Sequence, residues 1–267
     1  MINKDTSVCI SLSSRPSNFG TFIHNYVFEE LDLNFIYKAF SSDNLAGSIE
    51  AIKNLNIRGC GISMPFKEEV ISYLDHQDEN VKLSGSCNTL LNHKNEIYGF
   101  NTDFYALNKL FEQYNVASFK NGLIIGSGGV AKSAAHALLK HIDEIYLLAR
   151  NKNSALKLIG ETNLIHKNDN FSSVDVIINC TPLGMSSDDD LPCKLSIINN
   201  AKIIFDLPIC NKANKLKLKA QEKNIQYISG SKISLIQAHK QFEIYTSEVC
   251  DLSIYEKAFK AFKAQSL

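Results

Sequence analysis

The sequence predicts an α/β protein of two domains, one of which is built on a doubly wound parallel sheet. Short apolar runs alternate with amphipathic helical segments along most of the 267 residues, as in chains of βαβ units. One apolar run, residues 123–125, leads into a glycine-rich loop and a helix of small residues near the middle of the chain. Because more than a hundred residues precede this loop, we expect a separate domain before it.

The bulk composition argues against several other classes of protein. Hydrophobic residues make up 45% of the chain and charged residues 21%, which fits globular domains. Basic and acidic residues number 28 each, without the basic excess of a nucleic-acid-binding protein. No apolar run is long enough to cross a membrane, and the N-terminal residues lack a signal-peptide core. We therefore expect a cytoplasmic protein that binds neither nucleic acid nor membranes.

Cysteine and histidine spacing predicts reduced thiols and no metal site. The seven cysteines are odd in number, contain no C-x-x-C pair and mostly have apolar neighbours. The seven histidines are scattered, without the spacing of metal ligands.

Strands of the first domain are predicted from short apolar or alternating runs. They are residues 8–10, 35–40 and 59–63, followed by a hairpin of residues 87–91 and 97–101 around a polar turn. Residues 11–20, SLSSRPSNFG, are polar and contain Gly and Pro, so a loop is predicted there.

Helices of the first domain are predicted from apolar residues spaced three and four apart. They are residues 22–31, 45–55 and 103–114. Asp43 is the expected cap of the second of these helices. Pro65 suits the first turn of a further helix, which would carry Lys67 near its start.

The second domain is predicted from six more strands, with helical segments between most of them. The strands are near residues 123–125, 145–148, 163–166, 175–178, 203–205 and 225–228. Two helices follow Gly230, the last opened by the capping box of Ser253 and Glu256, and both should pack back on the first domain. The predicted domains are therefore residues 1–103 with 235–267, and residues 104–234.

The mid-chain loop, LIIGSGGVAKSAA at residues 123–135, fits the dinucleotide fingerprint G-x-G-x-x-A. Its glycines allow a tight turn close to a phosphate, and the first amides of the following helix would bind that anion. An ordinary strand-to-helix turn is the alternative. Past the next strand stands Arg150, where an NAD site carries an acidic residue, so NADP is favoured over NAD. A solvated arginine is the alternative for Arg150.

Polar residues follow three predicted strands of the first domain, where open α/β sheets bind their ligands. The groups are Ser63 with Lys67, Asn88 with Thr89, and Asn101 with Thr102 and Asp103. Taken alone, Lys67 could be a solvated lysine and Asp103 a helix cap.

Seven separated motifs occur in order along nearly the whole chain. They are Ser11-x-Ser13 with His24-Asn25 after it, GISMPFK with Ser63 and Lys67, Cys87-Asn88-Thr89, Gly99 to Asp103, GSGGVA, Asn179-x-Thr181-Pro182-x-Gly184-Met185, and Gly230 with Gln237-Ala238. In this set the sequence resembles the shikimate dehydrogenase family, and most closely its shikimate dehydrogenase-like branch, whose members can be slow on shikimate.

The resemblance implies a substrate-binding domain, a Rossmann-type NADP-binding domain and a catalytic pair, Lys67 and Asp103. The implied substrate-binding residues are Ser11, Ser13, Ser63, Asn88, Thr102 and Gln237. Together with the loop, the implied cofactor-binding residues are Gly126, Ser127, Gly128, Gly129, Val130, Ala131, Arg150, Asn151, Lys152, Thr181 and Gly230. Reducing a ketone requires a proton donor at the developing alkoxide, which a lysine can be.

The sequence departs from the family pattern around the substrate and the nicotinamide. In the motif D-x-x-Y-x-P-x-x-T-P, Asp206 remains, Ile209 replaces the tyrosine and Asn214-Lys215 replaces T-P. Ile233 stands where a methionine is expected. The N-terminal loop is longer than the usual S-x-S-P.

The expected activity is reversible NADP-dependent interconversion of 3-dehydroshikimate and shikimate, by a monomer or homodimer. One alternative is a quinate/shikimate dehydrogenase of relaxed specificity. A second is a low-turnover protein with a binding or regulatory role, and a third is a structural protein on a Rossmann scaffold.

Overall fold

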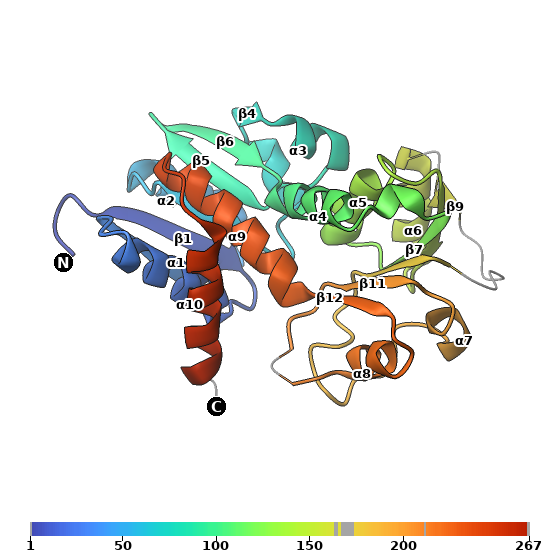
Figure 1. The fold of residues 1–267 in the computed structure, drawn as a ribbon. Coiled ribbons are helices and arrows are strands. Elements are labelled where there is room, and N and C mark those ends of the chain that lie inside the picture. Colours follow the sequence, from blue (N-terminus) through green and yellow to red (C-terminus); the bar gives the residue numbers. More distant parts are fainter. Residues whose placement is uncertain (1, 163–164, 167–173, 211, 266–267) are drawn as a thin grey trace. The chain divides into compact units, whose positions relative to one another are not determined.

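The computed structural model describes residues 2–162, 165–166, 174–210 and 212–265. The chain divides into two compact units, which we call the first unit (1–102 with 235–267) and the second unit (103–234). Helix α4 (Thr102–Gln113) begins at one boundary and helix α9 (Gly230–Thr246) spans the other (Figure 1). Within the described ranges, no helix is both long and apolar enough to cross a membrane.

The first unit is a mixed six-stranded sheet with the strand order β2-β1-β3-β5-β6-β4. Strand β1 pairs in parallel with β2 and β3, whereas β5 pairs antiparallel with β3 and β6. The predicted hairpin is confirmed as β5 and β6. The elements are β1 (Ser7–Ser13), α1 (Asn18–Glu30), β2 (Phe35–Ser41), α2 (Leu45–Asn54), β3 (Gly59–Ile62), η1 (Glu69–Tyr73), β4 (His76–Gln77), α3 (Glu79–Ser84), β5 (Thr89–His93), β6 (Glu96–Phe100) and α10 (Leu252–Gln265).

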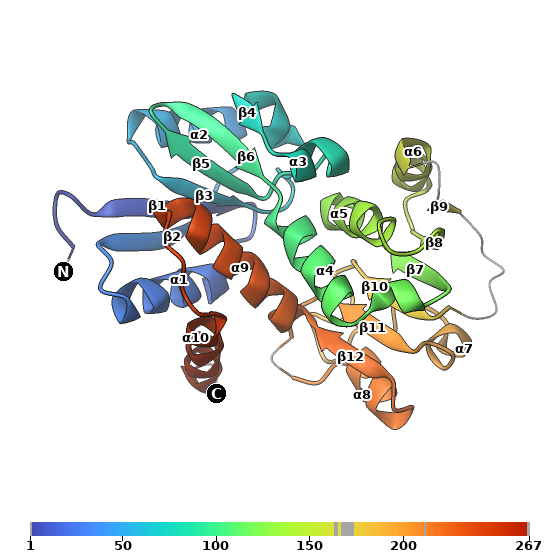
Figure 2. The same cartoon turned by 45° about the horizontal axis from the view of Figure 1, so that its top comes forward.

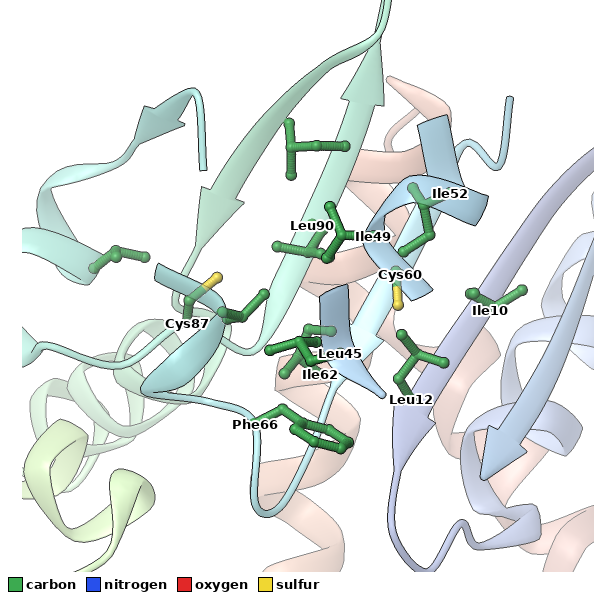
Figure 3. Packing of buried hydrophobic residues seen from close by; sticks show 13 residues of the cluster. Ile10, Leu12, Leu45, Ile49, Ile52, Cys60, Ile62, Phe66, Cys87 and Leu90 are labelled. Carbon is green, nitrogen blue, oxygen red and sulfur yellow. The ribbon is translucent and has the colours of Figure 1, made fainter. Parts of the chain in front are cut away.

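Two apolar clusters cover the two faces of this sheet. Figure 3 shows one of them, in which Ile10 and Leu12 of β1 pack with Ile49 of α2. Side chains alternate along a strand, so Cys9 faces the other cluster, which is built from α1, α9 and α10. The two C-terminal helices therefore pack on the first unit, as predicted.

The polar segment after the first predicted strand is not a loop throughout. Ser11 and Ser13 continue β1, because Ser11 pairs with Ala39 and Ser13 with Ser41 in the parallel register with β2. Pairing with a neighbouring strand thus overrides the polar composition.

The predicted caps of α2 and α10 are wrong, and so is the helix predicted at Pro65; α1 also begins at Asn18, within the predicted loop. The cap of α2 is Asn44 rather than Asp43, since the Asn44 side chain accepts from the Gly47 amide at 2.9 Å. Asp251, rather than Ser253, caps α10, accepting from the Ser253 amide at 2.7 Å. No helix begins at Pro65. The Phe66 amide instead donates to the Ser63 carbonyl at 3.0 Å, which closes a turn that buries Phe66.

The second unit is an all-parallel sheet with the strand order β12-β11-β10-β7-β8-β9. This is the doubly wound order, with its switch point between β7 and β10. The predicted strands are confirmed, except that residues 163–164 lie outside the described residues. The elements are η2 (Val116–Ser118), β7 (Asn121–Ile125), α5 (Gly129–Leu138), β8 (Glu144–Leu148), α6 (Lys152–Thr162), β9 (Ile165–His166), β10 (Val176–Asn179), α7 (Leu195–Ile198), β11 (Ile203–Asp206), α8 (Lys215–Glu222) and β12 (Gln226–Ser229).

Helices cover both faces of this second sheet, with α5 on one side and α8 on the other in Figure 2. Leu123 and Ile125 of β7 pack in one apolar cluster with residues of α7 and α8. On strand β11, Phe205 is fully buried and meets Phe111 of α4 edge-on, with ring centroids 5.0 Å apart. Burial on both faces explains why these strands read as continuous apolar runs.

Candidate functional site

Two of the predicted substrate residues, Ser11 and Ser13, lie on β1 and share one face of the sheet because they are two residues apart. Ser13 is buried, and Ser11 is half-buried and hydrogen-bonds the Tyr37 hydroxyl. Ser63 is exposed and follows β3, where its amide donates to the Leu12 carbonyl at 2.9 Å. All three therefore lie at the carboxyl ends of β1 and β3.

Asn88, Thr89 and Thr102 form a buried cluster between β5 and the start of α4. The Asn88 Oδ1 atom accepts from the Thr102 amide at 2.8 Å, the Thr89 hydroxyl at 2.9 Å and the Thr102 hydroxyl at 3.1 Å. The Asn88 Nδ2 atom is buried and has no hydrogen-bond partner among the described residues. A buried donor without a partner is costly, so the cluster suits a ligand that brings an acceptor.

Gln241 of α9 belongs to the same cluster, although the sequence prediction named Gln237. Gln241 is 4% exposed, and its Nε2 atom donates to Thr89 Oγ1 at 3.0 Å. Gln237 lies one helical turn earlier on the same face of α9 and is half-buried. Its role stays a prediction. Sequence reasoning missed Gln241 because a glutamine inside a helix carries no local signal of function.

Tyr37 and His24 complete the buried polar region behind β1 and β3. Their rings stack with centroids 4.5 Å apart. A Cβ atom on Gly61 would lie 2.8 Å from the Tyr37 hydroxyl, so a larger residue there would displace this side chain. Burial raises the pKa of Tyr37 and lowers the pKa of His24 to about 4, which keeps both side chains neutral.

The predicted catalytic residues are Lys67, which belongs to the first unit, and Asp103, which is the first residue of the second unit. Lys67 is half-buried in the turn before η1, and its carbonyl accepts from the Cys87 amide at 2.8 Å. This bond ties Lys67 to the residue beside Asn88. Asp103 is half-buried in the first turn of α4, next in sequence to Thr102. It therefore lies inside its helix rather than at the cap.

The glycine loop of the second unit lies between β7 and α5, at the switch point of the sheet. Gly126 has φ +113°, and a Cβ atom there would lie 3.2 Å from the Cys180 backbone. A Cβ atom on Gly128 would meet no atom of the described residues within 4 Å, so these residues leave open the space above this backbone. Gly129 and Val130 begin α5, Ser127 is half-buried and Ala131 is buried. The loop thus offers an open backbone cradle at a helix N-terminus, which suits an anion.

The three polar residues after β8 differ in what they do. Arg150 is exposed, as a residue that binds an external phosphate must be. The Asn151 side chain accepts from the Ser154 amide at 3.1 Å and so caps α6, of which exposed Lys152 is the first residue.

The two remaining predicted cofactor residues have local partners. The Thr181 hydroxyl donates to Asn179 Oδ1 at 2.7 Å. Gly230 begins α9, where a Cβ atom would run into the Leu207 carbonyl.

Asp206, the remnant of an altered motif, is fully buried in a polar network at the ends of β10 and β11. Its carboxylate accepts from Asn179 at 2.7 Å, from Asn214 at 2.9 Å and from the Tyr227 hydroxyl at 2.5 Å. Burial raises the pKa of Asp206, and these hydrogen bonds oppose the shift. Asn214 also caps α8, accepting from the Lys217 amide at 2.9 Å. The altered residues therefore still build an ordered strand end.

Comparison with protein families gives a match in the first unit. Residues 17–90 match the family model described as the shikimate dehydrogenase substrate binding domain. A shikimate dehydrogenase-like protein of Haemophilus influenzae is 36% identical over 253 residues, with 93% of each chain covered. The NADP(+) shikimate dehydrogenase of Clostridium beijerinckii is 33% identical over 256 residues, covering 89% of this chain and 93% of the relative.

Solved structures agree with these matches. A shikimate 5-dehydrogenase-like protein, 36% identical, aligns with a TM-score of 0.88 over 99% of this chain and 100% of the other. A shikimate dehydrogenase in complex with NADP+, 28% identical, aligns with a TM-score of 0.87 over 97% of this chain and 96% of the other.

Proposed function

The chain belongs to the shikimate dehydrogenase family, and from this premise we propose that it interconverts shikimate and 3-dehydroshikimate with NADP(H). The observation that carries the proposal is the Asn88 cluster. The Asn88 amide group, which has no partner among the described residues, matches a ligand that brings hydroxyl oxygens into a small polar site. The relatives named as NADP(+) shikimate dehydrogenases support the choice of substrate and cofactor.

In this proposal the first unit holds the substrate. Ser11 and Ser13 bind its carboxylate, and Ser63, Asn88, Thr102 and Gln237 hold the ring hydroxyls. Lys67 takes the proton of the reacting hydroxyl during oxidation and returns it to the alkoxide during reduction. Asp103 orients the Lys67 ammonium group and favours its charged form.

The second unit holds the cofactor in the same proposal. The open backbone at Gly128 and the first amides of α5 cradle the pyrophosphate, while Arg150 binds the ribose 2′-phosphate. Asn151, Lys152, Thr181 and Gly230 shape the surrounding loops. NADP+ held by these residues would supply the hydride acceptor for the oxidation. We further propose a cytoplasmic location, since all seven cysteines are free thiols.

A direct test is the appearance of NADPH absorbance when the purified protein meets shikimate and NADP+. The Lys67→Ala variant should be slower by at least about a hundredfold, the scale of general acid–base catalysis. A wild-type rate no higher than that of Lys67→Ala would refute the assignment to shikimate.

Relaxed specificity toward quinate is the second candidate. Ile209 lines a cavity of about 340 Å³ together with Met185, Ser187, Cys210 and Lys212, at the motif from which the tyrosine is lost. Ile209 lacks the phenolic hydroxyl with which a tyrosine at this position could select among ring substituents. Comparing rates on shikimate and quinate side by side tests this candidate, and a strong preference for shikimate would exclude it.

A further inference from the structure

Gln241 connects the Asn88 cluster to the core of the first unit. Its Nε2 atom lies 3.0 Å from Thr89 Oγ1 and 3.4 Å from the Asn88 carbonyl oxygen. A backbone carbonyl can only accept, so the side-chain atom facing it must be the nitrogen. The Oε1 atom of Gln241 is thereby turned toward His24, whose Nε2 atom is 3.4 Å away.

The same reasoning fixes the orientation of Asn88. The Thr102 amide can only donate, and it lies 2.8 Å from one terminal atom of the Asn88 side chain. That atom must be Oδ1. The Asn88 Nδ2 group is consequently turned away from Thr89 and Thr102 and keeps both of its protons unused among the described residues.

His24 lies at the far end of this chain of hydrogen bonds. Because Gln241 Oε1 accepts, His24 Nε2 must carry the proton, and Nδ1 is left to accept from the Tyr255 hydroxyl at 3.5 Å. His24 is 1% exposed, and burial holds its pKa at about 4, so it carries one proton rather than two. Donation therefore runs in one direction, from Tyr255 through His24 and Gln241 to Thr89.

We propose that Gln241 is a positioning residue, which, backed by His24, fixes Thr89 and Asn88 so that the Asn88 amide is presented to a substrate hydroxyl. The identity of that substrate rests on the proposed function, whereas the orientation of Asn88 does not. Gln241 acts without touching the substrate. It is a residue distinct from Gln237, which the sequence resemblance assigned to substrate binding.

Gln241→Met tests this role, because methionine keeps the length of the side chain but removes its hydrogen bonds. We expect the KM for shikimate to rise about tenfold, the scale of one lost hydrogen bond, with the KM for NADP+ unchanged. Gln221→Met, at an exposed position of α8, is the matched control and should behave as wild type. A parallel rise in both KM values would indicate general damage and overturn the proposal.

A double-mutant cycle with Asn88→Ala separates positioning from packing. If Gln241 acts through Asn88, then Gln241→Met should add nothing to the KM for shikimate once Asn88→Ala is present. Additive effects would overturn the proposal. Should the methionine variant fail to fold, Gln241→Glu keeps an acceptor opposite His24 but loses the amide donor to Thr89, and the same non-additivity is expected.

NMR of the ligand-free protein gives a readout that does not depend on the substrate. The imidazole nitrogen shifts of His24 should report a proton on Nε2, and the Asn88 side-chain amide should give one sharp pair of signals. Gln241→Met should broaden or shift the Asn88 pair, whereas Gln221→Met should not. A proton on His24 Nδ1, or an unmoved Asn88 pair, would overturn the proposal. Absent shikimate turnover would instead refute only the proposed function.

Discussion

Asn88 and Asp206 are buried polar side chains with opposite hydrogen-bonding states. Asp206 accepts from three side chains of its own unit, which satisfies it without any ligand. The Asn88 oxygen accepts three hydrogen bonds, whereas its amide nitrogen has no partner among the residues that the structure describes. Buried polar atoms are rarely left unpaired, so the Asn88 amide group is suited to a hydrogen-bond partner from outside.

Arg150 is the proposed ligand of the ribose 2′-phosphate of NADP. Replacing it by alanine should weaken NADP+ binding by roughly 1.5–3 kcal/mol, the scale of a charged hydrogen bond, and leave NAD+ binding almost unchanged. Titration calorimetry with both dinucleotides measures the difference. Lys157→Ala, which removes a cation from the following helix α6, is the control. Equal losses for the two cofactors would show that Arg150 does not bind the 2′-phosphate.

Burial of His24 should make the stability of the fold depend on pH. Burial lowers the pKa of His24 from 6.5 to about 4, so below about pH 6.5 the unfolded chain takes up a proton that the folded chain refuses. This difference removes on the order of 3 kcal/mol of stability as the pH falls from about 6.5 to about 4. His24→Gln should therefore flatten the pH dependence of urea unfolding over this range. The same substitution at exposed His93 is the control, and an unchanged slope in His24→Gln would contradict the prediction.

Site residues can be predicted from sequence where they belong to a motif. They cannot be predicted where only the tertiary fold brings them together. Asn88 and Thr102 were predicted, and they do meet in one cluster. Gln241 reaches that cluster from 152 residues away in sequence, through the packing of α9 on the sheet. No local pattern around Gln241 encodes such a contact.

In the glycine loop, Gly126 and Gly128 are needed for different structural reasons. Gly126 needs its positive φ and lies against the Cys180 backbone, whereas Gly128 has φ −86° and open space above it. The first glycine therefore shapes the loop, and the second leaves room for the ligand.

This difference predicts opposite outcomes for two alanine substitutions. Gly126→Ala should lower the unfolding free energy by about 1–3 kcal/mol, because a residue with a side chain is strained at this φ. Gly128→Ala should leave stability nearly unchanged but weaken NADP+ binding, since its methyl group would fill the cradle. Thermal unfolding and cofactor titration of both variants provide the comparison. Loss of stability only in Gly128→Ala would reverse the assignment.

At the start of α8, Asn214 both caps the helix and donates to Asp206. Asn214→Ala removes both the cap and a donor to buried Asp206, so we expect a loss of roughly 2–3 kcal/mol. Asn44→Ala removes only a cap, that of α2, and should cost about 1 kcal/mol. Urea unfolding of the two variants measures the difference. Equal losses would mean that the hydrogen bond from Asn214 to Asp206 contributes nothing to stability.

Whether a segment forms a helix or a strand is largely predictable, because the spacing of its apolar residues encodes it. The residue that caps each helix is not. Asp43 and Asn44 are adjacent capping residues, and only the backbone geometry decides which side chain reaches the Gly47 amide. Ser11 and Ser13 were predicted as loop because strand pairing with β2 cannot be read from their polarity.

At the scale of the whole molecule, the alternation of strands and helices was enough to predict a doubly wound sheet, since βαβ connections permit few topologies. The order of the mixed sheet in the first unit was less accessible. The two-residue strand β4 and the short helix α3 give signals too brief to detect.

The division of the chain has a consequence for its synthesis. The second unit is one continuous segment, whereas the first unit needs Leu235, Phe242 and Tyr255 to complete one of its two apolar clusters. A ribosome releases these residues only after every strand of the second unit has emerged. Nascent chains usually fold from the N-terminus onward. Here the unit that starts first is completed only after the second unit has been synthesised, and until then α1 alone of the three helices covers that face of its sheet.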